Sequence, residues 1–186
     1  MIKTFLVFIT TVAAACALEK PTYQTLLKAD NFEIRKYATI PIVSAPMENM
    51  QKRDDSFRSL FGYISGDNQK KQKISMTAPV FMNNGDAGEK AGTMSFVIPT
   101  EVAKKGAPVP AGKAVKVTKI EGGMFAVLKF KGWTDPGNRR QASADLLKRA
   151  TAAGYKPVGK SFFATYNPPW IPELFRRNEV WQRISK

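Results

Sequence analysis

The chain has 186 residues, and its 29 lysines and arginines against 15 acidic residues give a formal net charge of +14. It contains no histidine, the commonest metal ligand and general base, so a His/Cys metal site and a Ser-His catalytic triad are both excluded. The positive charge favours anionic partners such as lipid surfaces and small organic anions. Because the charges are spread along the chain, we expect a solvated basic surface and no nucleic-acid groove.

The first 17 residues have the pattern of a secretory signal peptide. Lys3 precedes an apolar run that is too short to span a bilayer, and the stretch ends in Ala-Cys-Ala, the small-x-small form of a cleavage site. We therefore expect export to the periplasm or the medium and a single mature domain over residues 18–186. Cleavage would remove Cys16, the only cysteine, so that the mature chain would depend on its apolar core instead of a disulfide.

Alternating apolar and polar residues predict three strands at the start of the mature chain, at residues 22–27, 32–37 and 39–45. The pair Asp30-Asn31 is typical of a turn between the first two strands. Pro41 lies in the third strand, and since proline has no amide hydrogen it favours a sheet edge or a bulge there.

A helix is predicted to follow from Asp54, because acidic residues suit the positive end of the helix dipole. Its apolar face is formed at i, i+3, i+4 and i+7 by Phe57, Leu60, Phe61 and Ile64. Gly66 is predicted to end it. Two antiparallel strands should come next, at 73–82 and 93–98, with a turn at 83–88 between them.

The second half begins again after a Pro- and Gly-rich loop at 99–113. Strands are predicted at 114–120 and 124–130, joined as a hairpin by Gly122-Gly123. A helix should run from residue 138 to 153 and end at Gly154, with an apolar face formed by Leu146, Leu147 and Ala150. The last two strands are predicted at 160–166 and 179–184.

Each half therefore follows the order strand-strand-helix-strand-strand. Two such units predict an α+β fold: a distorted antiparallel β-barrel with two flanking helices and a pseudo-twofold repeat.

Four separated stretches resemble the SOUL family of haem-binding proteins: FEIRKY at 32–37, FGYISGDN at 61–68, KISMTAPV at 73–80 and YNPPWIPELFRRNEVW at 166–181. They occur in order over nearly the whole mature chain, and the beginning is similar to exported bacterial members. The resemblance implies the two-helix barrel just described and a pocket for haem or another tetrapyrrole. The SOUL architecture in turn looks similar to that of the GyrI-like small-molecule-binding domains.

The resemblance implies that the haem-contacting surface lies near the first helix. A tetrapyrrole needs an apolar slot and cations for its propionates. The candidate contacts are Arg58, Tyr63, Lys73, Met76, Arg176 and Arg177. For each cation the alternative is a solvated surface charge, and for Met76 it is a place in the core.

Axial ligation of haem iron cannot use histidine here, which leaves Met76, Met50 and Tyr63 as conceivable ligands. We expect instead that haem is held by packing and propionate contacts alone. Such binding would be reversible and would suit a carrier or buffer, with no enzymatic activity and no resident metal site. We expect a monomer without a transmembrane segment and at most weak contact with an anionic membrane surface.

Glu179 carries the alternative hypothesis. It shares one face of its strand with Trp181 and Arg183, and an apolar pocket there would raise its pKa. It would then bind a cation or act as a general base in a GyrI-like pocket, as a small-molecule-binding or hydrolytic domain. The other possibilities are a surface pair with Arg177 or Arg183, and a filled barrel that serves only as an interaction module.

Overall fold

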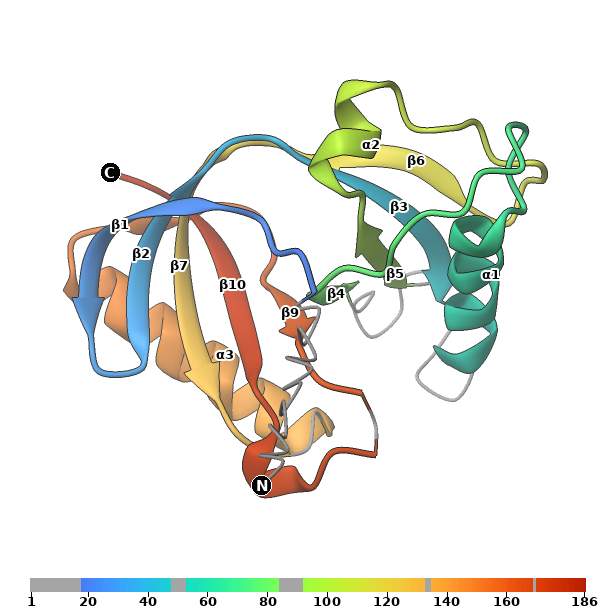
Figure 1. Ribbon diagram of the computed structural model, residues 1–186. Helices are drawn as coiled ribbons and strands as arrows, with labels where there is room; N and C mark the ends of the chain where they lie inside the picture. The colour runs from blue at the N-terminus through green and yellow to red at the C-terminus, as the bar shows by residue number, and fades with distance from the viewer. Residues whose placement is uncertain (1–17, 48–52, 84–91, 133–134, 169) are drawn as a thin grey trace, which may run out of the picture.

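The computed structural model describes residues 18–47, 53–83, 92–132, 135–168 and 170–186 (Figure 1). The predicted signal peptide, Met50 and most of the turn at 83–88 lie outside them. The helices are α1 (Arg53–Ser65), α2 (Thr100–Lys104) and α3 (Pro136–Ala152), with a 3₁₀ turn η1 (Glu173–Phe175). The strands are β1 (Tyr23–Ala29), β2 (Phe32–Tyr37), β3 (Ile40–Met47), β4 (Val80–Asn83), β5 (Gly92–Val97), β6 (Lys116–Ile120), β7 (Gly123–Phe130), β8 (Lys156–Pro157), β9 (Phe162–Thr165) and β10 (Asn178–Ser185).

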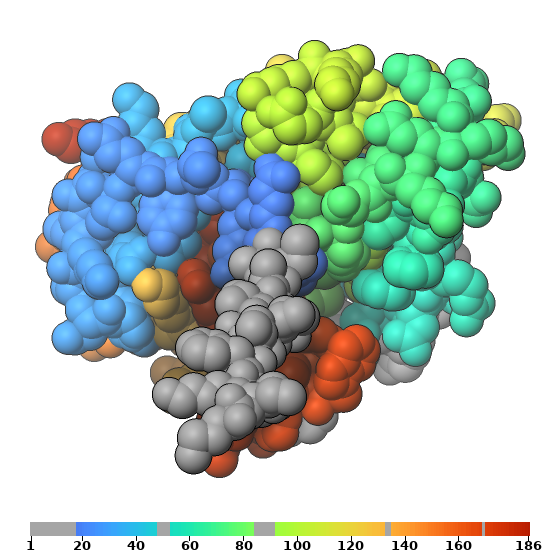
Figure 2. All heavy atoms as spheres, viewed as in Figure 1, coloured from blue at the N-terminus to red at the C-terminus, as the bar shows by residue number. Residues whose placement is uncertain are grey.

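The strands form one antiparallel sheet in the order β1-β2-β7-β10-β9-β4-β5-β3-β6, and β8 pairs with β10 outside this path. The path consists of two halves of the same design, β2-β7-β10-β9 with α3 and β6-β3-β5-β4 with α1, which meet where β9 pairs with β4. Figure 2 shows the halves as two lobes, with β1 and β2 in blue and α1 in teal on opposite sides. The α+β class and the repeated order are therefore as predicted.

The barrel prediction was wrong, because the sheet is open. Its two end strands are β1, whose residues are all exposed, and β6, which is mostly exposed. Each half lies against its own helix, and the end strands β1 and β6 lie on opposite sides of the molecule (Figure 1). Apolar side chains on one face of the sheet are buried against the helices and those on the other face against one another, without closure of the sheet.

The predicted hairpin at Gly122-Gly123 was also wrong. β6 pairs with β3, whereas β7 pairs with β2 and β10, so the chain crosses from one half to the other at these glycines. The segment from β2 to β3 crosses beside it (Figure 1). A Cβ on Gly122 would lie 2.9 Å from the Thr39 amide nitrogen, and Gly123 has a φ of +146°. The two glycines thus permit a close approach of two backbones.

The strand predicted at 73–82 is present only as β4. The residues before it are extended but pair little: the Ile74 amide donates to the Ile64 carbonyl at the end of α1, and the Thr77 hydroxyl donates to the Val97 carbonyl at 2.7 Å. Ile74 and Ala78 are buried by packing. The alternation of apolar and polar residues before β4 therefore reflects contacts with α1 and β5, and not the regular hydrogen bonding of a β-strand. The loop predicted at 99–113 contains the short helix α2.

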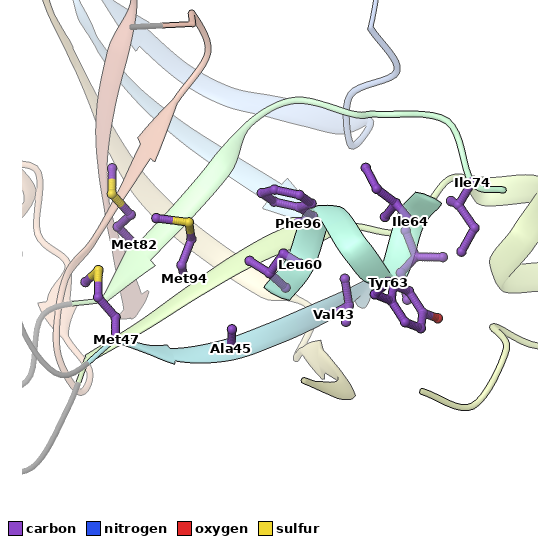
Figure 3. Close-up of a cluster of buried hydrophobic side chains, with 11 residues drawn as sticks. Val43, Ala45, Met47, Leu60, Tyr63, Ile64, Ile74, Met82, Met94 and Phe96 are labelled. Atoms are coloured by element: carbon purple, nitrogen blue, oxygen red, sulfur yellow. The ribbon is translucent and has the colours of Figure 1, made fainter. Parts of the chain in front are cut away.

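Each long helix covers one half of the sheet from outside. α1 packs on β3 and β5, and Figure 3 shows Leu60, Tyr63 and Ile64 directed toward Val43 and Phe96. α3 packs on β2, β7 and β10 through Ala142, Leu146 and Ala150. Its Asp135 N-cap accepts hydrogen bonds from the amides of Gly137 and Asn138, and Gly154 with a φ of +80° follows it, as predicted.

A third cluster of buried side chains lies on the sheet face turned away from both helices, here called the inner face. It contains Tyr37, Ile40, Ile42, Phe81, Val97, Phe125, Val127, Ala164 and Trp181. These residues alternate along their strands with those that contact the helices. None of the described helices is long and apolar enough to cross a membrane.

Candidate functional site

A cavity of about 530 Å³ lies on the outer side of α1. One wall is the helix face formed by Arg58, Ser59, Gly62 and Tyr63, and the other is the loop before β6, with Asp67 at the end of the helix. The loop contributes only small or aliphatic residues, Ala111, Gly112, Ala114 and Val115. The volume is in the range of small-molecule sites, and the small side chains let a flat ligand approach the loop backbone.

Tyr63 forms the buried side of this cavity. Its side chain is 1% exposed, and its hydroxyl donates to the Pro108 carbonyl at 2.8 Å. Burial raises the pKa of Tyr63. The Asn68 side-chain amide donates to the carbonyls of Tyr63 and Gln72, which holds the chain after α1 in place. This wall of the cavity is therefore rigid and its phenol stays neutral.

The rim of the cavity carries a positive charge. The Arg58 side chain is 81% exposed and contacts Asp55 at 3.4 Å, a surface pair of little energetic weight. Phe57 and Phe61, 41% and 51% exposed with their rings stacked at 6.1 Å, lie on the other flank of α1, where Phe57 also packs edge-on against Phe96. A ligand with a negative group would therefore meet a cation at this edge of the cavity.

Only two of the predicted contact residues, Arg58 and Tyr63, line this cavity. Lys73 is exposed, and Met76 is half-buried against the core cluster under α1. Arg176 and Arg177 precede β10 in the other half, where the Arg176 Nε donates to the Ile171 carbonyl at 2.7 Å. The six residues predicted as one site are thus divided between the halves.

Arg177 belongs instead to a buried charged network on the inner face, centred on Glu179. The Glu179 side chain is 0% exposed and accepts five hydrogen bonds. Arg35 donates to both carboxylate oxygens at 3.0 and 3.1 Å, Arg177 donates to Oε1 at 2.8 Å, and Oε2 also accepts from the Tyr166 hydroxyl and the Trp181 indole at 2.8 and 2.9 Å. Its acceptor positions are therefore filled by the protein.

Arg35 is the fully buried cation of this network, and it was not among the candidate site residues identified from the sequence. Its guanidinium is fully buried, donates from Nε to Glu33 at 2.6 Å and from a terminal nitrogen to the Tyr37 hydroxyl at 3.0 Å, and lies 4.3 Å from the Tyr23 ring centre. Lys129 forms the second ion pair of Glu33. The signal was present in FEIRKY, where Glu33, Arg35 and Tyr37 are three polar side chains on one face of a strand.

The prediction of a raised pKa for Glu179 was wrong. Burial alone would raise that pKa, but the hydrogen bonds and charges of Arg35, with those of Arg177 and Tyr166, outweigh burial and lower the pKa to about 2. A carboxylate held in this way is a poor general base and has no free oxygen for a cationic ligand. A pairing of Glu179 with Arg177 was one of the possibilities considered from the sequence. It was expected at the surface, whereas the Glu179 carboxylate is buried.

A second cavity, of about 480 Å³, lies on the inner face of the α1 half. It is lined by Ile42, Ser44, Ala45, Pro46, Phe81, Asn83, Thr93, Ser95, Lys116, Thr118, Ile120 and Phe162. Phe162 packs edge-on against Phe81 and contacts Trp181, so aromatic rings separate this cavity from Glu179. Within the described part of the chain no group of three His, Cys, Asp or Glu residues is placed to hold a metal ion.

The open antiparallel sheet, its two outer helices and a cavity on α1 define a class of small α+β ligand-binding domains. The family model of the SOUL heme-binding protein matches residues 18–183, so the chain belongs to the SOUL haem-binding family, as its motifs indicated.

Two mammalian relatives cover most of the chain. Human heme-binding protein 2 is 30% identical over 181 residues, which are 91% of this chain and 87% of the human protein. Mouse heme-binding protein 2 is 30% identical over 178 residues, 89% of this chain and 85% of the mouse protein.

Solved structures share the fold at low sequence identity. The C-terminal domain of EcmrR matches with a TM-score of 0.63 and 11% identity, over 88% of this chain and 98% of that domain. A hydrolase from Listeria innocua matches with a TM-score of 0.63 and 10% identity, over 86% and 94% of the two chains. These identities support the fold and say nothing of a shared activity.

Proposed function

We propose that the protein binds haem or a related tetrapyrrole reversibly in the α1 cavity, without histidine ligation, as a carrier or buffer in the cell envelope. Membership of the SOUL family supports tetrapyrrole binding. The observation that carries the location is the cavity itself, which combines a wall of small and aliphatic loop residues, the buried Tyr63 ring and the Arg58 guanidinium at its rim.

The residues of the cavity fit a flat, amphipathic ligand. A Cβ placed on Gly112 would meet no atom within 4 Å, so the loop leaves space in front of its backbone. Ala111, Ala114 and Val115 supply the apolar part of the lining. Asp67 is the one acidic residue of the lining, so the propionates should lie on the Arg58 side.

Axial ligation is not required by this arrangement. The Tyr63 hydroxyl is occupied by the Pro108 carbonyl, and burial, which raises its pKa, opposes the tyrosinate that iron would bind. Met76 is packed against the core instead of lining the cavity. Binding would then depend on shape and propionate charge, with fast release, as a carrier requires.

The envelope location follows from the signal-peptide pattern of residues 1–17, and export of a monomer without disulfides is consistent with the three apolar clusters. The location is tested by fractionating cells that produce the full chain. The mature N-terminus should begin at residue 18.

Titration with hemin and with iron-free protoporphyrin tests the binding mode. We expect saturable binding of both with similar affinity and a Soret band that hemin binding shifts only weakly. Because a strongly basic protein attracts any anionic porphyrin, an unrelated protein of equal charge is the control. Binding no better than that control would refute the proposal, and strong preference for the iron form would refute the absence of axial ligation.

A further inference from the structure

Residues 170–177 expose three large apolar side chains. Trp170 is 78% exposed, Leu174 75% and Phe175 74%, more than any other large apolar side chain in the described residues. They come from one short stretch around η1, which lies at the lower end of the molecule, red in Figure 1. Isolated exposed apolar residues are ordinary on protein surfaces, but three in six positions form a patch.

The backbone of this segment is held by hydrogen bonds, so the patch is presented in one arrangement. The Ile171 amide donates to the Pro168 carbonyl at 3.2 Å, and the Phe175 amide donates to the Pro172 carbonyl at 3.0 Å. At the end of the segment the Arg177 amide donates to the Asn167 side chain at 2.7 Å. The three side chains therefore project from a hydrogen-bonded turn.

Positive charge adjoins the patch. Arg176 follows Phe175 directly, whereas Arg177 is paired with Glu179, and Glu173 is the one acid between Tyr166 and Asn178. Glu173 lies close to Gly132, which places the exposed Lys131 beside η1. The chain as a whole is strongly basic. Apolar side chains next to cations are the combination by which peripheral proteins bind anionic bilayers.

The size of the patch also favours a membrane over a protein partner. Three side chains supply a few hundred Å² at roughly 150–250 Å² for each aromatic residue. A stable protein interface needs about 800 Å² from each partner. A bilayer anchor needs much less, because charge attraction to the lipid headgroups adds to insertion.

We propose that this segment is a membrane-docking loop, which inserts Trp170, Leu174 and Phe175 into the headgroup boundary of an anionic phospholipid bilayer while Arg176 and Lys131 contact the headgroups. Tryptophan suits this depth because its ring is apolar and its N–H is polar. Docking would hold a soluble carrier at the surface of the membrane.

Flotation with vesicles of phosphatidylcholine, with and without phosphatidylglycerol, tests the proposal on the mature chain. We expect binding to the anionic vesicles and a blue shift of tryptophan emission that Trp170→Phe removes. The triple variant Trp170→Ala/Leu174→Ala/Phe175→Ala should bind roughly tenfold or more weakly. The matched control Leu26→Ala/Val109→Ala/Val158→Ala removes exposed apolar side chains elsewhere and should bind like the parent.

Equal vesicle binding by the triple variant and the parent would overturn the proposal, since bulk charge alone would then explain the association. Absence of parental binding to anionic vesicles would also overturn it. Hemin titration of the same variants separates this surface from the α1 cavity. A triple variant that loses hemin binding and keeps vesicle binding would assign the segment to the porphyrin site instead.

Discussion

Arg35 and Glu179 form a buried, two-bond ion pair across the inner face, although their strands β2 and β10 are not neighbours in the sheet. β7 lies between them, so the Arg35 side chain reaches over that strand to the carboxylate. The pair joins residues 144 positions apart in the sequence. It therefore ties the first strands of the domain to the last one.

Glu179→Gln should destabilise the protein strongly. The change keeps the shape but leaves Arg35 and Arg177 without their shared carboxylate, and breaking a buried pair costs about 3–5 kcal/mol. Urea unfolding followed by circular dichroism measures the difference. Glu101→Gln is the control, because Glu101 forms an exposed pair with Lys104, and it should change the unfolding free energy by less than about 1 kcal/mol. Equal effects of the two changes would contradict the buried network.

Stability should decline in acid through the same carboxylate. The pKa of Glu179 is about 2 in the folded protein and ordinary, 4.5, in the unfolded chain. Its contribution is thus fully present above about pH 4.5 and is lost as the pH falls toward 2. This difference in the pKa of Glu179 corresponds to about 3 kcal/mol in the free energy of unfolding. The lowered pKa of Glu33 acts in the same direction.

Urea unfolding at a series of pH values between about 5 and 2 measures this loss, and Glu179→Gln separates the contributions. The variant lacks the titrating group, so its stability should depend less steeply on pH over this window. Parallel curves for parent and variant would show that the acid sensitivity arises from other carboxylates.

Local patterns predicted most elements of this fold because their causes are local. The i, i+3, i+4 apolar spacing predicted α1, although Phe57 and Phe61 of that spacing are exposed, and Gly154 predicted the end of α3. The hairpin predicted at Gly122-Gly123 was wrong because a glycine pair is typical both of a hairpin turn and of a close approach of two backbones. Only the position of residues 37–39, far away in sequence, decides between the two.

The site was less predictable for the same reason. Motif resemblance pointed to the α1 surface and to Arg58 and Tyr63, which line one cavity. The spacing of Arg177 and Glu179 indicated their pairing, but nothing local showed that the Glu179 carboxylate would be buried or that Arg35 would reach across a strand to it. Partners of a buried charge depend on sheet order, and two similar halves allow more than one order.

Arg58 should contribute modestly to tetrapyrrole affinity. Its exposed guanidinium would pair with a propionate in solvent, where such a pair is worth less than about 1 kcal/mol, or roughly fivefold in affinity. Arg58→Gln should weaken hemin binding by about that factor and leave binding of hemin dimethyl ester unchanged. Arg53→Gln on the same helix does not alter the cavity lining and should bind like the parent. A matching loss with the ester would show that Arg58 acts through packing.

Gly112→Phe should block the cavity while the domain stays folded. Gly112 does not have a positive φ, and a Cβ at this position would have no atom within 4 Å, so a side chain enters open space without backbone strain. A phenyl ring there would occupy the slot that we assign to the porphyrin, and we expect hemin affinity to fall at least about tenfold. Val109→Phe is the matched control, because Val109 is 56% exposed on the same loop and does not line the cavity. Unfolding curves should be unchanged for both variants. If Gly112→Phe binds hemin as the parent does, the tetrapyrrole must bind elsewhere, and the inner-face cavity at Phe81 and Phe162 becomes the next site to block.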